Sequence, residues 1–516
     1  MRKPIALMVV LVSLVAKAQP YQPSWGSWSN VTYNAFGEER IGAMAWTPDG
    51  KVGLCGSYLD NSPLGDQVFY ALLDTAGFLD PAFDGDGFVT HNVCTTTERC
   101  TDMVMLADGR MLSVGYEDFT GAPDQLFVHR INTDGTMDST FAVDGEFLLM
   151  LNGTTRGMSI GHQSNERIIV AGWDGNWESF VMRLHPDGTL DTSFGENGYR
   201  FLPVSLGDLN ETRKLVVLPD DGIAVVGYYF IQSTIAHNSY LWRLDADGNT
   251  VTGFGNNGLV LVPCSNGRCD QQELISVWPN GDLQTAGYWS FVWPGGIQGS
   301  SFMRFSANGQ LVTSWGTNGR VQLPLYVESV TAKLQAVHPL PDGRLLALPQ
   351  RLEHSLIALL ADGSPDLSFG PDGRWQANLG SNTPFMQHDM VVTPDGGKVL
   401  IGSGVGVYNS FLVTQLFIPQ LSTGMSPSII ADNAGPRLLG RLPGDDALML
   451  EWPAGMAGDA NIALYAVDGR WIGTVYQGPI GSTGPVQLQL PENISNGTYL
   501  FVVRTTQGTT AFRFIR

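Results

Sequence analysis

The stretch LDTSFGENG, residues 190–198, places an aromatic residue between two turns. The same pattern returns as LDPAFDGDG at 79–87, MDSTFAVDG at 137–145, VTGFGNNG at 251–258, LVTSWGTNG at 311–319 and PDLSFGPDG at 365–373. Glycine allows the backbone angles of tight turns, and aspartate accepts hydrogen bonds from nearby backbone amides. One aromatic residue at a fixed register in each copy is what packing between neighbouring repeats requires. We therefore interpret the motif as scaffold rather than as a binding site.

A second motif alternates with the first, for example LADGRMLSVG at 106–115 and LPDDGIAVVG at 218–227. It recurs in seven copies, about 55–60 residues apart, as in a repeat architecture. Each unit has four short segments rich in Val, Leu and Tyr and bounded by turn residues, as β-strands are. The pattern predicts an all-β fold with a seven-bladed β-propeller over residues 19–419. Since the last unit lacks a fourth strand, residues near 33–40 are expected to complete it.

The repeats resemble the delta-60 repeat family, whose units combine a PDGK turn, a glycine after the second strand and a DGTLDTSFG-type connection. The resemblance covers residues 33–419 and implies the propeller fold. Two units depart from the pattern: the third has SNERIIVAG in place of the Asp-Gly turn, and the sixth lacks the closing glycine.

The N-terminus has the pattern of a secretory signal peptide. Arg2 and Lys3 precede an apolar run, and Ala16-Lys17-Ala18 matches an A-x-A cleavage site. We expect residues 1–18 to be removed and the protein, a monomer, to reach the medium or the outer cell surface through the periplasm. The formal net charge of −20 repels phosphate backbones, so nucleic acid is not an expected partner.

The chain has five cysteines. In an exported protein, cysteines that lie close together in the sequence predict local disulfides. The segments CTTTERC and CSNGRC predict Cys94–Cys100 and Cys264–Cys269. Cys55 is left over within a strand pattern, where we expect a buried free thiol.

The repeat period stops near residue 420. Residues 420–436 are rich in Ser, Gly and Pro and predict a linker, and the short strands of 437–516 predict a small β-sandwich. LYAVDGRWIG at 464–473 and the final NGTYLFVVRTTQGTTAFRFIR resemble the type A sorting domain of the type IX secretion system. Gly469, Gly497, Tyr499 and Arg516 stand at matching positions. The resemblance implies recognition by the outer-membrane secretion machinery. The usual Asn-Pro near the start of that domain is absent, and a carbohydrate-binding or Ig-like module is the alternative.

Motifs for catalysis are sparse. GMSIG at 157–161 matches a nucleophile-elbow pattern around Ser159, with His162 close by, but that chemistry needs a strand–turn–helix context and a propeller strand is expected here. The sequence has no HExxH, CxxC or P-loop motif. We therefore expect no catalytic residue, no metal site and no cofactor. Arg130, Arg183, Arg243 and Arg304 share one position in the third strands, and the sequence offers no explanation for them.

Binding is expected on the loops that join the second strand of each unit to the third, because variable loops on a rigid scaffold usually carry function. We call this side of the ring the loop face. Its aromatic residues can stack on sugar rings or anchor a protein, or simply pack within strands. The candidate ligand-binding residues are Trp173, Trp177, Tyr229, Trp289 and Trp293. The sequence thus predicts a secreted or cell-surface binding scaffold for a glycan or protein ligand. One alternative is a secreted hydrolase or lyase acting on polysaccharide, which needs two or three carboxylates at the loop-face end of the central channel. Another is a purely structural surface protein.

Overall fold

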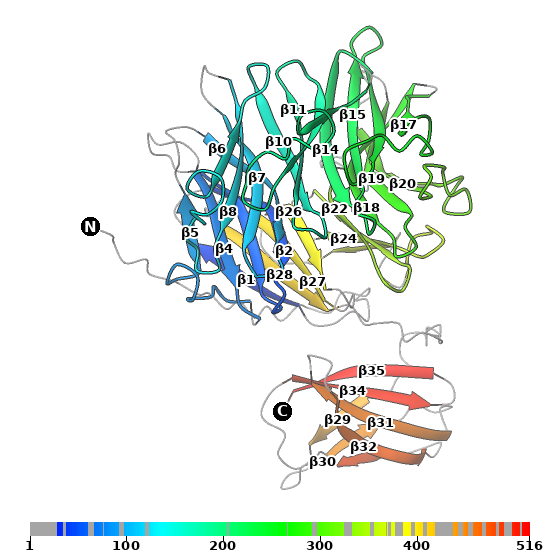
Figure 1. Ribbon diagram of the computed structural model, residues 1–516. Helices are drawn as coiled ribbons and strands as arrows, with labels where there is room; N and C mark the ends of the chain where they lie inside the picture. The colour runs from blue at the N-terminus through cyan, green and yellow to red at the C-terminus, as the bar shows by residue number, and fades with distance from the viewer. Residues whose placement is uncertain are drawn as a thin grey trace. The chain divides into compact units, whose positions relative to one another are not determined.

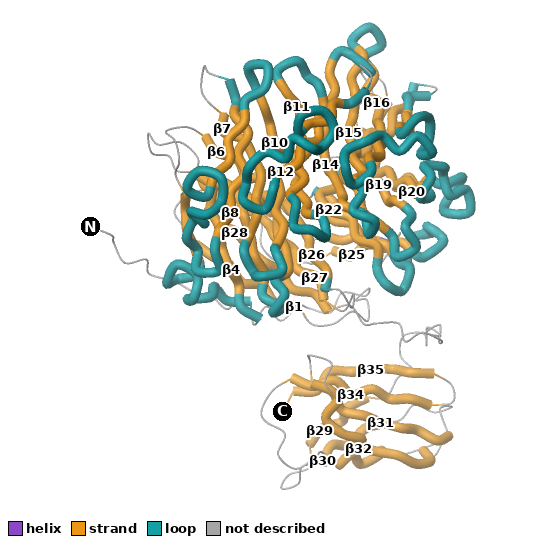
Figure 2. Tube along the Cα trace, in the orientation of Figure 1, coloured by secondary structure: helices purple, strands orange, loops and turns teal. Residues whose placement is uncertain are grey.

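The computed structural model describes residues 28–417 and the strands between residues 437 and 515, with gaps. The gaps are residues 35–37, 60–66, 76, 92–96, 119–122, 204–205, 266, 292–296, 325–332, 351–354, 368, 370–372, 377–384, 394–397, 406–409, 442–446, 452–457, 467–470, 481–484, 490–497 and 506–507. The expected signal peptide (1–18) and linker (420–436) lie outside the described residues, as do Cys94 and Trp293. All regular secondary structure in the described part of the chain is β-strand (Figure 2). Within it, no helix is long and apolar enough to cross a membrane.

Six four-stranded antiparallel sheets follow one another along the chain (Figure 1). Each is built from four consecutive strands, and we number them blades 1 to 6. Blade 1 is β2 (Glu38–Trp46), β3 (Val52–Leu59), β4 (Gln67–Leu73) and β5 (Phe88–His91), and blade 2 is β6 (Thr97–Met105), β7 (Met111–Asp118), β8 (Gln125–Ile131) and β9 (Glu146–Leu149). Blade 3 is β10 (Thr155–His162), β11 (Ile168–Asp174), β12 (Ser179–Leu184) and β13 (Tyr199–Phe201), and blade 4 is β14 (Leu209–Val217), β15 (Ile223–Ile231), β16 (Ala236–Leu244) and β17 (Leu259–Val262). Blade 5 is β18 (Arg268–Val277), β19 (Leu283–Phe291), β20 (Ile297–Phe305) and β21 (Arg320–Pro324), and blade 6 is β22 (Leu334–Pro339), β23 (Leu345–Pro349), β24 (Ser355–Leu359) and β25 (Arg374–Gln376).

The strands left at the two ends of the propeller region form one further sheet, which we call the composite sheet. It joins β26 (Phe385–Val392), β27 (Lys398–Val405) and β28 (Ser410–Phe417) to β1 (Trp28–Asn34). β1 runs antiparallel to β28, with Trp28 opposite Leu416 and Asn34 opposite Ser410. The first strands of successive blades contact one another, and β26 contacts both β22 and β2, so the ring closes.

The prediction of a seven-bladed β-propeller is therefore wrong. Six blades, not seven, are each built from one continuous stretch of chain, and the composite sheet takes its strands from opposite ends of the propeller region. Its completing strand is Trp28–Asn34 rather than residues near 33–40. The register explains the shift, because pairing with β28 ends at Asn34 and β2 of blade 1 already begins at Glu38.

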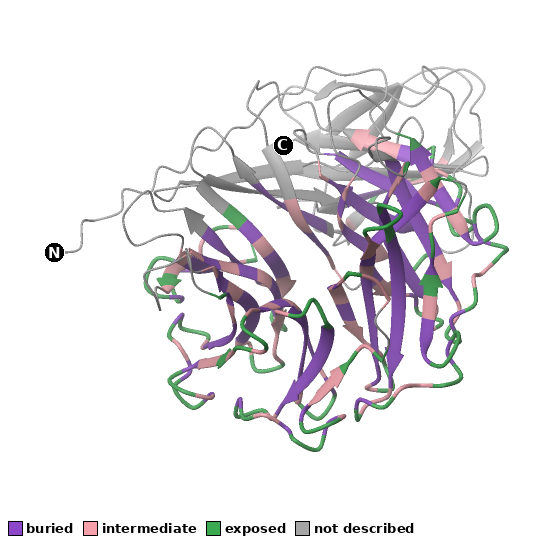
Figure 3. Cartoon of the chain, turned by 90° about the horizontal axis from the view of Figure 1, so that it is seen from above, coloured by how far each residue is buried: buried purple, intermediate pink, exposed green. Residues whose placement is uncertain are grey.

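The repeated aromatic residue packs between blades, as its fixed register suggested. Phe194 is fully buried and lies in one apolar cluster with Val225 and Trp242 of the following blade. Next to it, the Gly195 amide donates a hydrogen bond to the Asp247 carbonyl of blade 4, at 2.9 Å. The equivalent aromatics Phe83, Phe141, Phe254, Trp315 and Phe369 are buried in the same way. Figure 3 shows how buried residues follow the strands and exposed ones the turns. Burial of each ring stabilises its interface by about 2–3 kcal/mol.

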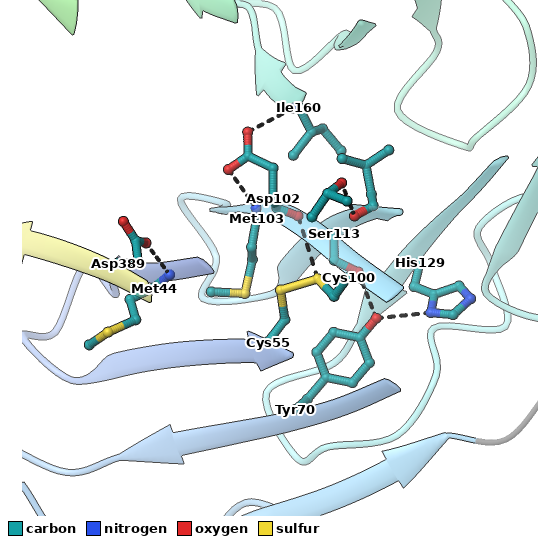
Figure 4. The surroundings of a disulfide bond; sticks show 12 residues. Met44, Cys55, Tyr70, Cys100, Asp102, Met103, Ser113, His129, Ile160 and Asp389 are labelled. Carbon is teal, nitrogen blue, oxygen red and sulfur yellow. Dashed lines mark hydrogen bonds between the residues drawn. A yellow bond between two sulfur atoms is a disulfide. The ribbon is translucent and has the colours of Figure 1, made fainter. Parts of the chain in front are cut away.

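The disulfide prediction is partly wrong. Cys100 is bonded to Cys55, so Cys55 is not a free thiol, and Cys94 is not the partner of Cys100 (Figure 4). Cys100 lies on the buried face of β6, which packs against blade 1, and there Cys55 of β3 comes within 6.3 Å between Cα atoms. Packing between blades, rather than closeness in sequence, therefore decides this pairing. Cys264 and Cys269 are bonded as predicted.

Residues Leu421–Arg516 form a second compact unit, distinct from Met1–Gln420. One antiparallel sheet contains β29 (Arg437–Arg441), β30 (Ala447–Glu451) and β33 (Pro485–Gln489). The other contains β32 (Trp471–Ile480), β31 (Gly458–Ala466), β34 (Thr498–Thr505) and β35 (Gly508–Ile515), in that order. Ala460, Ile462 and Leu464 of the central strand β31 are buried. The final strand β35 lies at a sheet edge.

Candidate functional sites on the first strands and on the loop face

The first strand of each of the six blades carries a β-bulge at the same position, and so does β26 of the composite sheet. The register shifts lie between Ile41/Ala43, Cys100/Asp102, Gly157/Ser159, Thr212/Lys214, Gln272/Leu274, Leu334/Ala336 and Gln387/Asp389. A bulge adds one residue and re-aims the side chains beside it. It brings Asp102, Ser159, Lys214 and Asp389 to equivalent positions around the ring. The sequence pattern did not indicate this level, because the position holds five residue types in seven sheets: Ala, Asp, Ser, Lys and Leu.

At this level Asp102 binds both Ser159 and Lys214. The Ser159 hydroxyl donates to Oδ2 of Asp102 at 2.6 Å, and Nζ of Lys214 lies 2.7 Å from Oδ1. The Ile160 amide also donates to Oδ2 at 3.0 Å (Figure 4). Burial opposes the charged form of Lys214, but Asp102 and Asp389 outweigh it, so the pKa of Lys214 is raised. The Ser159 hydroxyl is thus committed to Asp102 rather than to His162.

Asp389 belongs to the same level but has a different environment. Its Oδ2 accepts a hydrogen bond from the Met44 amide at 2.7 Å, which joins the composite sheet to blade 1 (Figure 4). Burial raises the pKa of Asp389 to about 6, and the Lys214 charge only partly offsets this. The contact that closes the ring therefore contains a carboxyl group that titrates near neutral pH.

Two carboxylates converge on Arg213, the bulge residue of blade 4. Glu211 lies 3.7 Å from Nη1 of Arg213, and Glu273 of blade 5 lies 3.9 Å from its Nε. Tyr228 and Tyr288 adjoin this group. Burial, together with Glu211, raises the pKa of Tyr228, and the Tyr288 hydroxyl donates to Gln271 at 2.5 Å. Sequence reasoning missed this group because its acidic residues come from different repeats and share no motif.

A cavity of about 690 Å³ opens among the turns that follow the first strands, on the opposite side from the loop face. Five sheets contribute to its wall, which is mostly Val, Leu and Pro. His162 and His338 both line it, although they come from blades 3 and 6. The His338 Nε2 donates to the Met390 carbonyl at 2.9 Å, and burial lowers the pKa of this imidazole.

On the loop face, the candidate aromatic residues separate into two groups. Trp173 and Trp177 stack with ring centroids 4.5 Å apart and planes 10° apart, and Trp177 is 37% exposed against 6% for Trp173. Tyr229 is buried in the core cluster between blades 3 and 4, so its role is packing. Trp289 lies edge-on to Phe291 at 5.8 Å, with the Arg268 guanidinium 3.9 Å from its ring. The structure thus brings Trp173 and Trp177 together but places Tyr229 and Trp289 elsewhere.

The arginines in the third strands have two kinds of partner. Nε of Arg183 lies 2.7 Å from Asp191, the aspartate of the quoted LDTSFG stretch, and Arg130 binds Asp138 in the same way. In blades 4 and 5 a valine replaces that aspartate, at Val251 and Val312. Arg243 and Arg304 bind the turn after the first strand instead, through Asp220 and Asp282. These arginines therefore belong to the scaffold of each blade.

Among the described residues, no group of three or more His, Cys, Asp or Glu is placed to hold a metal ion. Residues 106–141 and 163–194 match the family model described as Domain of unknown function (DUF5122) beta-propeller. The chain is a β-propeller protein. No curated protein matches it.

Solved structures similar to this β-propeller include PorZ, a surface component of the type IX secretion system of Porphyromonas gingivalis. The two share 14% identity over 92% of this chain and 59% of PorZ, with a TM-score of 0.43. The chain thus spans 59% of the PorZ structure's length. The propeller domain of the Trilobed protease of Pyrococcus furiosus is 8% identical, over 74% of this chain and 94% of that one, with a TM-score of 0.40. An α-L-arabinanase of Penicillium chrysogenum is 10% identical, over 61% and 92%, with a TM-score of 0.37.

Proposed function

We propose that the protein is a secreted or cell-surface scaffold that binds a glycan or protein ligand on its loop face. One contrast supports this proposal most directly. On the first strands of blades 2 to 4, the polar side chains of Ser159 and Lys214 both bind Asp102. On the loop face, by contrast, the aromatic side chains of Trp177 and Phe291 reach solvent, at 37% and 47% exposed. A rigid ring with exposed aromatic residues on its connecting loops is suited to recognition.

A binding screen with the full chain lacking residues 1–18 tests this proposal. The protein is applied to a glycan array and to purified extracellular proteins, and each hit is repeated by calorimetric titration. We expect saturable binding to at least one ligand that heat-unfolded protein does not retain. Absence of saturable binding in both screens would overturn the scaffold proposal.

We propose further that the unit Leu421–Arg516 is a sorting domain that directs export through the type IX secretion system. Its C-terminal segment carries the sequence resemblance. It is compact by itself, and its last strand β35 occupies a sheet edge, where backbone groups are open to pairing with another chain. Recognition of this unit at the outer membrane would take place separately from folding of the ring.

Truncation tests the export proposal. A chain ending at Gln420 retains every propeller strand, so we expect it to fold and to remain in the periplasm. Replacement of only the last strand segment, TAFRFIR at 510–516, should have the same effect. The full chain is the control, and cell fractionation is the measurement. Truncated protein outside the cell in normal amounts would end the sorting-domain assignment and favour a binding module.

A polysaccharide hydrolase or lyase is the second candidate, and the convergence of Glu211 and Glu273 on Arg213 favours it. Glycoside hydrolysis generally needs two carboxyl groups beside the scissile bond. If the protein acts in this way, Glu211→Gln and Glu273→Gln each abolish product release from polysaccharides. The control is Glu196→Gln, which should retain product release. Glu196 is exposed and forms an ion pair with Arg200 at 3.1 Å. If the unmodified chain releases no sugar or unsaturated product, this candidate fails.

A further inference from the structure

We propose that Trp177, stacked on Trp173, is the platform on which a sugar ring of a neutral glycan binds. This inference rests on the proposed binding function and names its site and ligand class. Trp177 lies at the tip of the hairpin between β11 and β12, on the loop face of blade 3.

Flat groups in contact with one another support the platform. Trp177 stacks on Trp173, and the guanidinium of Arg156 lies 5.2 Å from the Trp173 ring and 4.4 Å from the Tyr116 ring of blade 2. Nε of Arg156 donates to Asp124 at 2.5 Å. Cation–π contacts and a charge-assisted hydrogen bond therefore hold the groups that support the exposed indole in place.

The backbone of Trp177 is held in an unfavourable conformation. Its φ is +58°, in the left-handed region that bulky residues rarely adopt. The hairpin fixes it, because the Trp177 amide donates to the Asp174 carbonyl at 2.9 Å. The Trp177 carbonyl in turn accepts a hydrogen bond from the Asn210 amide of blade 4, at 3.1 Å. A strained residue persists where its surroundings determine it fully, as in ligand clamps.

The exposed face of Trp177 fits a carbohydrate better than a protein. A protein interface needs about 800 Å² on each partner with an apolar centre, yet the neighbours Asn176 and Glu178 are polar and exposed. A sugar ring combines an apolar C–H face, which can lie on the indole, with hydroxyl groups at its edge. Asn176 and Glu178 offer hydrogen-bond partners to those hydroxyls. The net charge of −20 disfavours acidic sugars, so the ligand class is a neutral glycan.

Titration of the full chain with neutral hexasaccharides tests this inference. The probes are cellohexaose, laminarihexaose, xylohexaose and mannohexaose, followed by calorimetry and tryptophan fluorescence. We expect at least one hexasaccharide to bind, and we expect Trp177→Ala to lower the affinity for it by about tenfold or more. Trp177→Phe keeps a flat ring and should therefore lose less affinity than Trp177→Ala. Phe78→Ala removes an aromatic side chain that is similarly exposed, at 39%, in the connection between β4 and β5 rather than on the loop face, and it should leave the affinity unchanged. Thermal melting confirms that each variant is folded.

Each result separates the site from the wider function. Binding of a probe with equal affinity to the chain and to Trp177→Ala overturns the platform while the scaffold function stands. The platform is overturned in the same way if no neutral probe binds and the chain instead binds acidic glycans or a protein. Absence of any ligand overturns both.

Discussion

Ile235 is a β-branched residue with a left-handed backbone, at φ +51°. It sits in the turn between β15 and β16, and its side chain is 47% exposed, so packing does not compensate for the strain. We expect Ile235→Asn to raise the free energy of unfolding by about 1 kcal/mol, since asparagine tolerates this conformation far better. Thermal melting of the propeller transition measures the gain.

A matched control separates backbone strain from surface polarity. Leu261 is equally exposed, at 45%, but lies in the regular strand β17. Leu261→Asn should therefore bring no gain. Equal shifts in the two variants would show that removal of an exposed apolar side chain, rather than relief of strain, is responsible.

The sequence predicted the role of some residues and not of others. The aromatic of the LDTSFG motif was identified as scaffold because its position is invariant, and the structure buries it. Trp177 and Tyr229 belong to similar loop segments, yet one is exposed and the other lies in the core. The difference arises from how long each hairpin extends beyond its blade, which local pattern does not encode. The Glu211–Arg213–Glu273 group was missed for a related reason, since the bulge of β14 and the packing of β14 against β18 bring it together.

At the level of the elements, the two disulfides differ in what they restrain. The Cys55–Cys100 bond joins β3 of blade 1 to β6 of blade 2 across 45 residues of chain, whereas Cys264–Cys269 spans five. The cost of closing a loop in the unfolded chain rises with its length, which gives about 4 kcal/mol of stabilisation for the first and about 2 kcal/mol for the second. We therefore expect Cys55→Ala/Cys100→Ala to lower the unfolding free energy more than Cys264→Ala/Cys269→Ala. Chemical denaturation of both double variants checks this order, and an equal loss would contradict it.

Strand β1 should be essential to the composite sheet, because it covers the edge of β28. Deletion of residues 19–34 leaves that edge open, so we expect a lower melting temperature and self-association through strand pairing. Deletion of 19–27, which spares β1, is the control. Light scattering and melting curves are the measurements, and addition of a peptide of residues 28–34 should restore the monomer. A monomeric deletion product with unchanged melting would show that β1 is dispensable.

For the whole ring, the buried Asp389 makes stability depend on pH. Its folded pKa of about 6 exceeds the ordinary value of 3.8, so the folded state binds the proton more tightly. This group therefore stabilises the fold most at low pH, and that contribution is lost as pH rises from about 4 to about 6, at up to about 3 kcal/mol. Asp389→Asn can keep the bond to the Met44 amide without the charge. We expect it to be more stable than the unmodified chain at pH 7.5, with the difference vanishing near pH 4.

Denaturation curves across this pH range provide the test. The quantity compared is the difference in unfolding free energy between the two proteins, because the other titrating groups contribute equally to both. The charges that face Asp389 are Lys214 and Asp102. A difference that stays constant from pH 4 to 7.5 would mean that Asp389 is as well solvated in the folded state as in the unfolded one.

The composite sheet also decides when folding can finish. β1 is synthesised before every other strand of the ring, but its partner β28 ends at Phe417, after all six continuous blades. Pairing across such a sequence separation is slow, because a long loop must close before the contact stabilises anything. The six continuous blades can form in order during synthesis. β1, in contrast, cannot pair until β28 has been synthesised. A chain that stops short of β28 is left with open sheet edges. Only a chain synthesised as far as β28 can therefore close the ring.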